Sequence, residues 1–541
     1  ILMNKKLILL IILLLGISVG AMASEVNYNV IPMPQNVVAQ KGAFTLNANV
    51  KISYPKGDAD MARNAQFLKE YVKHNTGIEL QTLEGGKKGI VLKIDKTIAN
   101  SEGYTLTVKG NGVTIAGSTP AGVFYGIQTL RKSIPVENAA VVKLPAVTVT
   151  DAPRFAYRGT MLDVCRHFFP VDSVKQFIDV LALHNVNRMH WHLSEDQGWR
   201  IEIKSLPRLT EIGQWRMETM IKKSWTEYDG KPYGGYYTQE QIKDIIKYAA
   251  DRYITIIPEI DMPGHMLAAL TAYPNLGCTG GPYAVWTHWG VSRAVLCAGN
   301  DDVLKFIETV LNEVIDLFPS EYIHVGGDEC PKDLWKECPK CQARIKQLGI
   351  KGDSKHSAEE YLQSFIIKHA EKVITKRGRK LIGWDEILEG GLAPSATVMS
   401  WRGEAGGIEA ANLDHDVIMT PNTYLYFDYY QVPKDQVKNE PYAIGGSLPV
   451  EHVYNYEPLP AVLSPERQKH IVGVQCNLWT EYIPTISKAE YMLLPRLAAL
   501  CETQWSPKGT KDYPRFLDQL PRLAAIYDSY GYSYGKHVIK K

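Results

Sequence analysis

The chain has 541 residues, which is too long for one ordinary domain and predicts two or three. Hydrophobic residues make up 45% of the sequence and charged residues 22%, and no stretch has low complexity, which excludes disordered and fibrous proteins. The formal net charge is only +2, so the chain lacks the basic field that would attract nucleic acid or an acidic membrane, and we expect neither as a partner.

The first residues have the pattern of a cleavable secretory signal peptide, over residues 1–23. Lys5 and Lys6 precede an apolar run at residues 7–19, and small residues at 21–23 supply a cleavage site. The apolar run is shorter than the about 20 residues that a membrane anchor needs. No cysteine follows residue 23 directly to accept a lipid. The sequence therefore predicts a periplasmic or secreted protein without a stable membrane anchor.

Residues 24–150 are expected to form a small α+β domain, because short apolar strands alternate with turns and two helical patterns. The predicted strands lie at residues 50–54, 89–94, 104–108 and 113–116, and the helices at 60–76 and 121–133. No convincing cluster of catalytic side chains falls in this stretch. Packing support is the role that we expect of it.

From residue 151 onwards, apolar strands alternate with amphipathic helices. The predicted strands lie at residues 157–163, 188–193, 254–259, 322–326, 380–384, 397–401, 416–420 and 471–475, with helices at 171–184, 239–251 and 303–317. Eight parallel strands separated by helices indicate an α/β fold, a (β/α)8 TIM barrel, over residues 151–510. Residues 511–541 are expected to form a helical segment that packs on this barrel.

Polar and aromatic side chains follow the carboxyl ends of most of these strands. They include Asp163 and Arg166, residues 192–199 and 259–265, Asp328 and Glu329, residues 384–386, Trp401, and residues 479–481. In a TIM barrel these ends converge on one face, where active sites lie. The sequence therefore predicts one site built from many strand ends.

Asp328 and Glu329 are the most informative pair in the sequence. They follow a buried strand and two glycines, Gly326 and Gly327, which let the backbone turn sharply and approach a ligand. Two carboxyl groups this close do not both ionise easily, so one is expected to keep a proton near neutral pH, as a general acid does. The alternative is that both acids only cap a following helix.

Tryptophans at the strand ends favour a sugar as the ligand. Trp384, Trp401 and Trp479 stand among acids, and indole faces stack on pyranose rings while carboxylates accept hydrogen bonds from hydroxyls. Each tryptophan alone is as often part of a core. Residues 259–265 add two acids and a histidine, but their spacing fits no common zinc motif.

The eight cysteines leave two possibilities open. Cys278 and Cys297 bracket a loop rich in glycine and tryptophan that a disulfide could close. Cys338 and Cys341 have the spacing of a pair of zinc ligands, but no second such pair and no pair of histidines completes the site in the sequence. An inert structural role is therefore favoured, and we expect no metal and no cofactor.

Six motifs along the chain share a resemblance to one known family. They are Arg158-Gly-Thr-Met-Leu-Asp163, Arg166-His-Phe168, His192-Leu-Ser-Glu-Asp-Gln-Gly-Trp-Arg200, Pro258-Glu-Ile-Asp-Met-Pro-Gly-His265, His324-Val-Gly-Gly-Asp-Glu329 and Trp479-Thr-Glu481. Together they resemble the β-N-acetylhexosaminidases of glycoside hydrolase family 20. The similarity spans nearly the whole chain after residue 23, and it includes an α+β domain ahead of the barrel.

The resemblance implies an exo-acting, retaining enzyme that hydrolyses terminal non-reducing N-acetylglucosamine or N-acetylgalactosamine from glycans by substrate-assisted catalysis. The 2-acetamido oxygen of the sugar would attack the anomeric carbon while Glu329 protonates the leaving oxygen, and Glu329 would later activate water. Asp328 would accept the acetamido N–H, and Tyr426 would donate to the acetamido oxygen.

The resemblance also implies the residues that hold the sugar. Arg158 would hold the 3- and 4-hydroxyls, while Asp428 and Glu481 would reach the 4- and 6-hydroxyls. The three tryptophans named above would enclose the acetamido methyl group and the ring.

A relay behind the proton donor is implied as well. His265 would act with Asp196 or Glu195, and many relatives have two aspartates at this pair of positions. The assignment within the pair therefore stays open.

Other functions remain as alternatives. A disaccharide-releasing relative such as a lacto-N-biosidase needs a longer pocket, for which Trp286 and Trp289 could supply a wall or simply pack the loop. A conventional two-carboxylate glycosidase would take its nucleophile from another strand end, such as Glu386 or Glu481. A non-catalytic surface glycan-binding protein would use the same tryptophans but would not need a proton donor. A metal-dependent hydrolase would be inhibited by a chelator.

Overall fold

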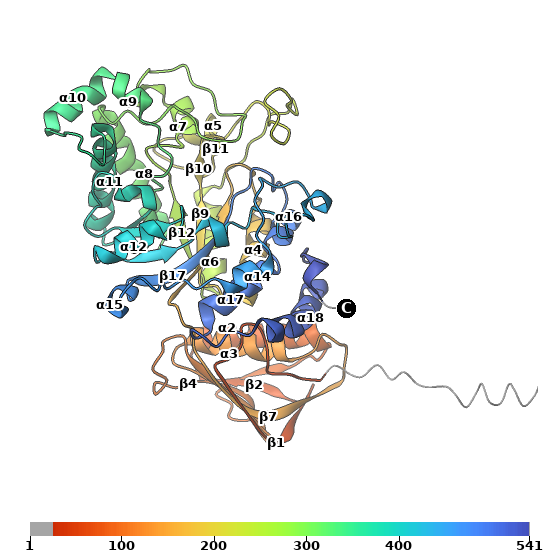
Figure 1. Cartoon of the computed structure of the whole chain (residues 1–541). Coiled ribbons are helices and arrows are strands. Elements are labelled where there is room, and N and C mark those ends of the chain that lie inside the picture. The colour runs from red at the N-terminus through yellow and green to blue at the C-terminus, as the bar shows by residue number, and fades with distance from the viewer. Residues whose placement is uncertain (1–24, 540–541) are drawn as a thin grey trace, which may run out of the picture. The chain divides into compact units, whose positions relative to one another are not determined.

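The computed structural model describes residues 25–539 (Figure 1). The chain forms two compact units, residues 25–30 with 36–150 and residues 31–35 with 151–539. The predicted signal peptide lies outside the described residues. Within residues 25–539, no helix combines the length and the apolar character that crossing a bilayer requires.

The first unit is a seven-stranded sheet with two helices packed on it. Figure 1 shows both helices on one face of the sheet. The strand order is β1 (Asn36–Asn47), β7 (Val141–Asp151), β5 (Tyr104–Lys109), β6 (Gly112–Gly117), β4 (Gly89–Ile94), β2 (Lys51–Tyr54) and β3 (Gln81–Glu84). The helices are α2 (Ala59–Thr76) and α3 (Pro120–Ser133). Helix α2 begins where Asp58 accepts the Met61 N–H and ends at Gly77 in the left-handed region, which are ordinary start and stop signals.

The second unit contains a closed barrel in which all neighbouring strands run parallel. In order around the barrel they are β8 (Tyr157–Asp163), β9 (Arg188–His192), β12 (Thr255–Glu259), β13 (Tyr322–His324), β14 (Lys380–Trp384), β15 (Thr397–Ser400), β16 (Val417–Met419) and β17 (Ile471–Leu478). The predicted TIM barrel is confirmed.

Helices and short segments surround the barrel. They are α4 (Val171–Leu183), β10 (Ser194–Glu195), β11 (Gly198–Trp199), α5 (Arg208–Glu211), α6 (Gln239–Ala250), α7 (Leu267–Ala272), η1 (Pro274–Leu276), α8 (Asp301–Leu317), α9 (Asp333–Glu337), α10 (Pro339–Leu348), α11 (Ala358–Lys376), η2 (Asp385–Leu388), α12 (Ala405–Asn412), α13 (Asn422–Leu425), η3 (Val437–Asn439), α14 (Val450–Asn455), α15 (Pro465–Gln468), α16 (Ile486–Leu493), α17 (Arg496–Trp505), α18 (Tyr513–Tyr530) and η4 (Lys536–Val538). Two long helices begin with reciprocal caps, Thr238 with Gln241 for α6 and Ser357 with Glu360 for α11.

The interior of the barrel is apolar and leads up to a polar layer. Ile257, Ile382, Met399 and Ile418 form its buried core together with Trp384. The carboxyl ends of the barrel strands then carry buried histidines and acids. This change from apolar to polar side chains marks the site.

The structure also tests the expected disulfide. Cys278 and Cys297 carry no disulfide, and each sulfur lies 3.7 to 3.8 Å from that of Cys341, too far for a bond. The Cys278–Cys297 disulfide that the sequence left possible is therefore not formed in this structure, and Cys341 lies close to both sulfurs.

Candidate active site

The segment after β13 places two carboxyl groups in different environments. Gly326 and Gly327 both have positive φ, 65° and 98°, and a Cβ atom on Gly326 would overlap Asp261. Glu329 also has a positive φ, 42°. This turn buries Asp328, which is 8% exposed, and leaves the Glu329 side chain 45% exposed. The glycines thus allow one acid to be buried beside an accessible one.

A cavity of about 410 Å³ lies over these two acids, within the size range of small-ligand sites. Eight of the predicted site residues line it: His265, Asp328, Glu329, Trp401, Tyr426, Asp428, Trp479 and Glu481. They come from the carboxyl ends of different strands, as the sequence predicted. Glu195, Asp196 and Trp384 do not line the cavity but lie behind it.

His265 connects the acids at the floor of the cavity. Its Nε2 lies 3.7 Å from Asp328 Oδ2 and 3.7 Å from Glu329 Oε2. Its Nδ1 lies 2.7 Å from Glu195 Oε1 and 3.5 Å from Asp196 Oδ2. Burial disfavours the imidazolium, but the neighbouring carboxylates, Glu195 above all, raise the pKa of His265 well above its usual range. The neighbouring carboxylates therefore favour the protonated form of His265.

Asp328 has a raised pKa. Burial raises the pKa of its carboxyl to about 6, while His265 beside it acts in the opposite direction. Burial and the charge of Asp328 also raise the pKa of Asp261 well above its ordinary range. The sequence predicted that one carboxyl group of the pair keeps a proton near neutral pH, but a pKa of about 6 leaves Asp328 mostly ionised at pH 7.

The prediction for Arg158 is wrong. Arg158 stands at the beginning of β8, and its guanidinium donates to the carbonyl oxygens of Phe155 and Asn185, both at 2.9 Å, at the opposite end of the barrel from the cavity. Arg166 lines the cavity instead, because it follows the carboxyl end of β8. Two neighbouring motifs each contain one of these arginines, and their positions at the beginning of β8 and after its end distinguish them.

Arg166 is fixed by a buried set of acceptors. Its Nη2 lies 3.0 Å from Glu195 Oε2 and its Nη1 lies 3.4 Å from Asp163 Oδ2. Its Nε donates to Gln197 Oε1 at 3.1 Å. Its guanidinium also lies 5.0 Å from the centre of the Trp479 ring. The guanidinium group of Arg166 is thus held in one orientation at the cavity wall.

Two acids of the cavity wall, buried Asp428 and partly buried Glu481, have buried oxygens that remain available to a ligand. Asp428 Oδ1 and Glu481 Oε2 have no hydrogen-bond partner among residues 25–539. Burial raises the pKa of both carboxyls, and each group also feels its neighbours' negative charge. Buried polar atoms without partners are costly, so these oxygens are typical of a site that hydroxyl groups complete.

The tryptophans differ in depth. Trp401 and Trp479 line the cavity, and Tyr426 packs against both, at ring-centre distances of 5.9 and 6.4 Å. Trp384 is 1% exposed and lies behind Trp479, 5.9 Å between ring centres. Its indole N–H donates to Glu259 Oε1 at 2.8 Å. Trp384 therefore closes the bottom of the site, in contrast to the wall position predicted for it.

The sequence places Glu259 at the end of a predicted strand, but no role was predicted for it. Besides Trp384, it contacts His190 at 2.9 Å, His192 at 2.5 Å and His324 at 3.1 Å. Burial opposes its ionisation, but the histidines hold the pKa of Glu259 well below its usual range. This buried network fixes the layer on which the cavity rests.

Of the two loop tryptophans, Trp289 lines the cavity and Trp286 does not. Glu386, an alternative nucleophile, accepts a hydrogen bond from the Trp401 indole at 2.9 Å and does not line the cavity. Burial, with Asp328 and Asp385 nearby, raises the pKa of Glu386 to about 8. A protonated, tethered carboxyl is unsuited to nucleophilic attack.

A comparison with known families decides the identity. The model "Glycosyl hydrolase family 20, catalytic domain" matches residues 155–508, and "Glycosyl hydrolase family 20, domain 2" matches residues 27–152. The chain belongs to glycosyl hydrolase family 20. The resemblance read from the six motifs is thereby confirmed, and the two family models together cover most of both units.

Individual relatives agree with this family assignment. The chain is 46% identical over 518 residues to a β-hexosaminidase of Porphyromonas gingivalis, covering 94% of this chain and 64% of that protein. The crystal structure of a family 20 exo-β-N-acetylglucosaminidase from Vibrio harveyi, in complex with N-acetylglucosamine, matches with a TM-score of 0.83 and 33% identity, over 95% of this chain and 79% of that one. An N-acetyl-β-hexosaminidase of Streptomyces plicatus matches with a TM-score of 0.80 and 30% identity, over 94% and 96% of the two chains.

Proposed function

We propose that this family 20 member is an exo-acting, retaining β-N-acetylhexosaminidase that removes terminal β-linked N-acetylglucosamine or N-acetylgalactosamine from glycans. The observation that carries the proposal is the pair of unlike acids on one cavity, buried Asp328 beside accessible Glu329, with His265 Nε2 3.7 Å from each. A binding protein has no need for such a pair. Two of the relatives named above, which are called a β-hexosaminidase and an exo-β-N-acetylglucosaminidase, support a hexosaminidase reaction.

In the first step the sugar supplies its own nucleophile. The acetamido oxygen attacks the anomeric carbon, the glycosidic bond breaks, and a cyclic oxazolinium forms. Asp328 accepts the acetamido N–H through its carboxylate and stabilises the positive charge that develops there. The Tyr426 hydroxyl donates to the attacking oxygen, and burial keeps that hydroxyl protonated because it raises the pKa of Tyr426 well above its usual range.

Glu329 moves the proton in both steps. It protonates the leaving oxygen as the bond breaks and then takes a proton from the water that opens the oxazolinium. The imidazolium of His265 lies beneath both carboxyl groups, and Glu195 holds its other nitrogen. We propose that His265 compensates the negative charge on Asp328 and on Glu329 as the proton leaves.

The side chains of the cavity wall determine which sugar binds. We propose that Arg166, rather than Arg158, binds the hydroxyls at positions 3 and 4, and that the unpartnered oxygens of Asp428 and Glu481 bind those at positions 4 and 6. The guanidinium donates and the carboxylates accept, so each hydroxyl finds a partner of matching polarity. Trp401 and Trp479 enclose the ring.

Two readouts test this function on β-linked N-acetylglucosamine oligosaccharides. Proton NMR of the first sugar released should show the β-anomer, since two displacements retain configuration. The first product should be a monosaccharide from the non-reducing end. Release of disaccharides would favour the lacto-N-biosidase alternative, and release of the α-anomer would contradict the double displacement.

We also propose that the protein is exported, on the strength of the pattern at residues 1–23. Sequencing the amino terminus of the mature protein from its own cells tests this. A start at Ser24 in the extracytoplasmic fraction is expected, and an intact Met3 in the cytoplasm would contradict it.

A further inference from the structure

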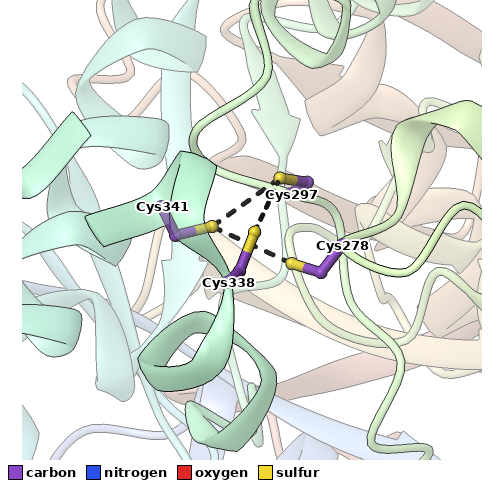
Figure 2. Close-up of side chains that lie close together, drawn as sticks. All are labelled: Cys278, Cys297, Cys338 and Cys341. Atoms are coloured by element: carbon purple, nitrogen blue, oxygen red, sulfur yellow. Dashed lines mark hydrogen bonds between the residues drawn. The ribbon is translucent and has the colours of Figure 1, made fainter. Parts of the chain in front are cut away.

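Four cysteines from distant parts of the chain come together outside the cavity. They are Cys278, Cys297, Cys338 and Cys341, and we call them the cysteine cluster (Figure 2). Their side chains point toward a common centre, and all four sulfurs lie within 4.8 Å of one another. Three of the four residues are buried, and Cys278 is half-buried. The sequence showed only one pair with metal-ligand spacing, and the fold supplies the second.

The sulfur spacing is that of a tetrahedral thiolate site. The distances are 3.8 Å for Cys278 to Cys341, 3.7 Å for Cys297 to Cys341 and 3.7 Å for Cys297 to Cys338. Thiolates bound about 2.3 Å from zinc at tetrahedral angles stand about 3.8 Å apart. A disulfide instead needs about 2.0 Å between two sulfurs and leaves them apart from other thiols. Here Cys297 and Cys341 each have two equal sulfur neighbours, so no pair is singled out.

The backbone around the cysteine cluster holds the two segments that carry the cysteines close to each other. Cys297 N–H donates to the Leu276 carbonyl at 2.8 Å, and Gly277 pairs with Leu296, so the two ends of the 278–297 loop are held side by side. On the other side, Cys338 precedes the first turn of α10. A Cβ atom on Gly299 would overlap the backbone of Lys340 and Cys341, so a glycine is required where the two segments meet.

We propose that the cysteine cluster binds one zinc ion as a structural site. Four thiolates fill the coordination sphere of zinc and leave no position for water or substrate, which is the mark of a structural rather than a catalytic site. Each thiol loses its proton on binding, and no electron is transferred. Cys338 and Cys341 at the start of α10 form one half of the site, and the loop ends form the other.

The proposed zinc site lies where it can stabilise the wall of the active-site cavity. The 278–297 loop contributes Trp289 and Val291 to the cavity wall, and its Ser292 N–H donates to Asp196 Oδ2 at 2.9 Å. Zinc would join the base of this loop to α10, which follows the Asp328 segment in the chain. The metal therefore holds one cavity wall against the segment that carries the catalytic acids, without touching either.

Metal analysis of the purified protein tests the proposal directly. One equivalent of zinc per chain is expected, and cobalt exchanged into the site should give the intense visible absorption of tetrahedral thiolate coordination. Cys338→Ser and Cys341→Ser should each lose most of the zinc. Cys476→Ser is the matched control, because Cys476 is equally buried but faces Thr160 at 3.6 Å, and it should keep one equivalent.

Counting thiols separates zinc from the competing disulfides. If zinc is bound, the denatured and chelated protein should show all eight thiols of the sequence. Two disulfides would leave four, with a mass lower by four hydrogens and no metal, and that result would overturn the proposal. So would protein with eight thiols that binds no zinc on titration.

A third readout tests the structural role. Removing zinc with a chelator should lower the Tm and raise KM severalfold more than it lowers kcat, because the Trp289 wall loosens while Glu329 is untouched. Restoring zinc should reverse both effects. An unchanged Tm and KM after complete removal of zinc would contradict a structural role.

Discussion

His265 Nδ1 lies 2.7 Å from Glu195 Oε1, and both side chains are almost fully buried. Asp196 lies farther away, at 3.5 Å, and its two oxygens accept the backbone N–H groups of Leu267 and Ser292 instead. The sequence left open which acid supports the histidine. The geometry points to Glu195, with Asp196 as an anchor for the backbone around it.

Replacing Glu195 by glutamine should lower the charge on His265. Because Glu195 is the main group that raises the pKa of His265, the substitution should lower that pKa and reduce kcat by about 10- to 100-fold, as for other partners that orient a reacting group. The measurement is kcat against pH, in which the alkaline limb should move to lower pH. Asp196→Asn is the comparison, and it should mainly lower the Tm. Equal pH profiles in the two variants would contradict this division of roles.

Glu329→Gln should reveal the proton donor through the leaving group. We expect kcat on glycosides of poor leaving groups to fall by about 10²- to 10⁴-fold, while KM changes little. A dinitrophenyl glycoside needs no protonation, so its bond-breaking step should be nearly unaffected. The Glu329 side chain is 45% exposed, and the Tm should therefore stay the same. An equal loss on both kinds of substrate would argue against general acid catalysis by Glu329.

Asp328→Asn should inactivate the protein and stabilise it. Activity should fall by about 10²- to 10³-fold, because the acetamido group loses its carboxylate partner. The pKa of Asp328 is about 6 against an ordinary value of 3.8, so the folded state binds more protons between these values and stability falls as pH rises through them. At pH 7 the buried charge costs about 3 kcal/mol.

Unfolding of Asp328→Asn in denaturant at pH 5 and pH 7.5 checks this linkage. The variant should be more stable than the parent at pH 7.5, and the difference should shrink at pH 5. In the parent, kcat/KM should also decline as pH falls below about 6, where the carboxylate gains a proton. A variant that is less stable than the parent at pH 7.5 would show that Asp328 is not a buried charge.

Arg166 and Arg158 should behave differently when each is replaced by lysine. Arg166→Lys should raise KM about 10- to 100-fold, the equivalent of losing a charged hydrogen bond of about 1.5 to 3 kcal/mol to the sugar. Arg158→Lys should lower the Tm and leave KM unchanged, because its partners are backbone carbonyls at the other end of the barrel. Kinetics on one substrate with both variants decides the matter, and a KM effect from Arg158→Lys would restore the original prediction.

The barrel was predictable because its strands are short apolar runs that end in acids, as at Asp163 and Glu259. Strand β1 was missed because the first eight of its residues are exposed and give no apolar alternation. Arg158 was chosen over Arg166 because the sugar-binding role was carried over from the resemblance, although the predicted strand at residues 157–163 already placed Arg166 after its carboxyl end.

The cysteine cluster shows a second limit of the sequence. Its two halves are separated by about 40 residues, and nothing local to Cys297 indicates that Cys338 will face it. Only the fold brings the loop ends to the start of α10.

The most direct test of the central claim compares two substrates of the purified protein, nitrophenyl β-N-acetylglucosaminide and the matching nitrophenyl β-glucoside. They differ only in the 2-acetamido group, which is the nucleophile of the proposed mechanism. Rapid release of nitrophenol from the first and none from the second is the predicted result. Equal cleavage of both would require a nucleophile from the protein and would contradict the role given to Asp328.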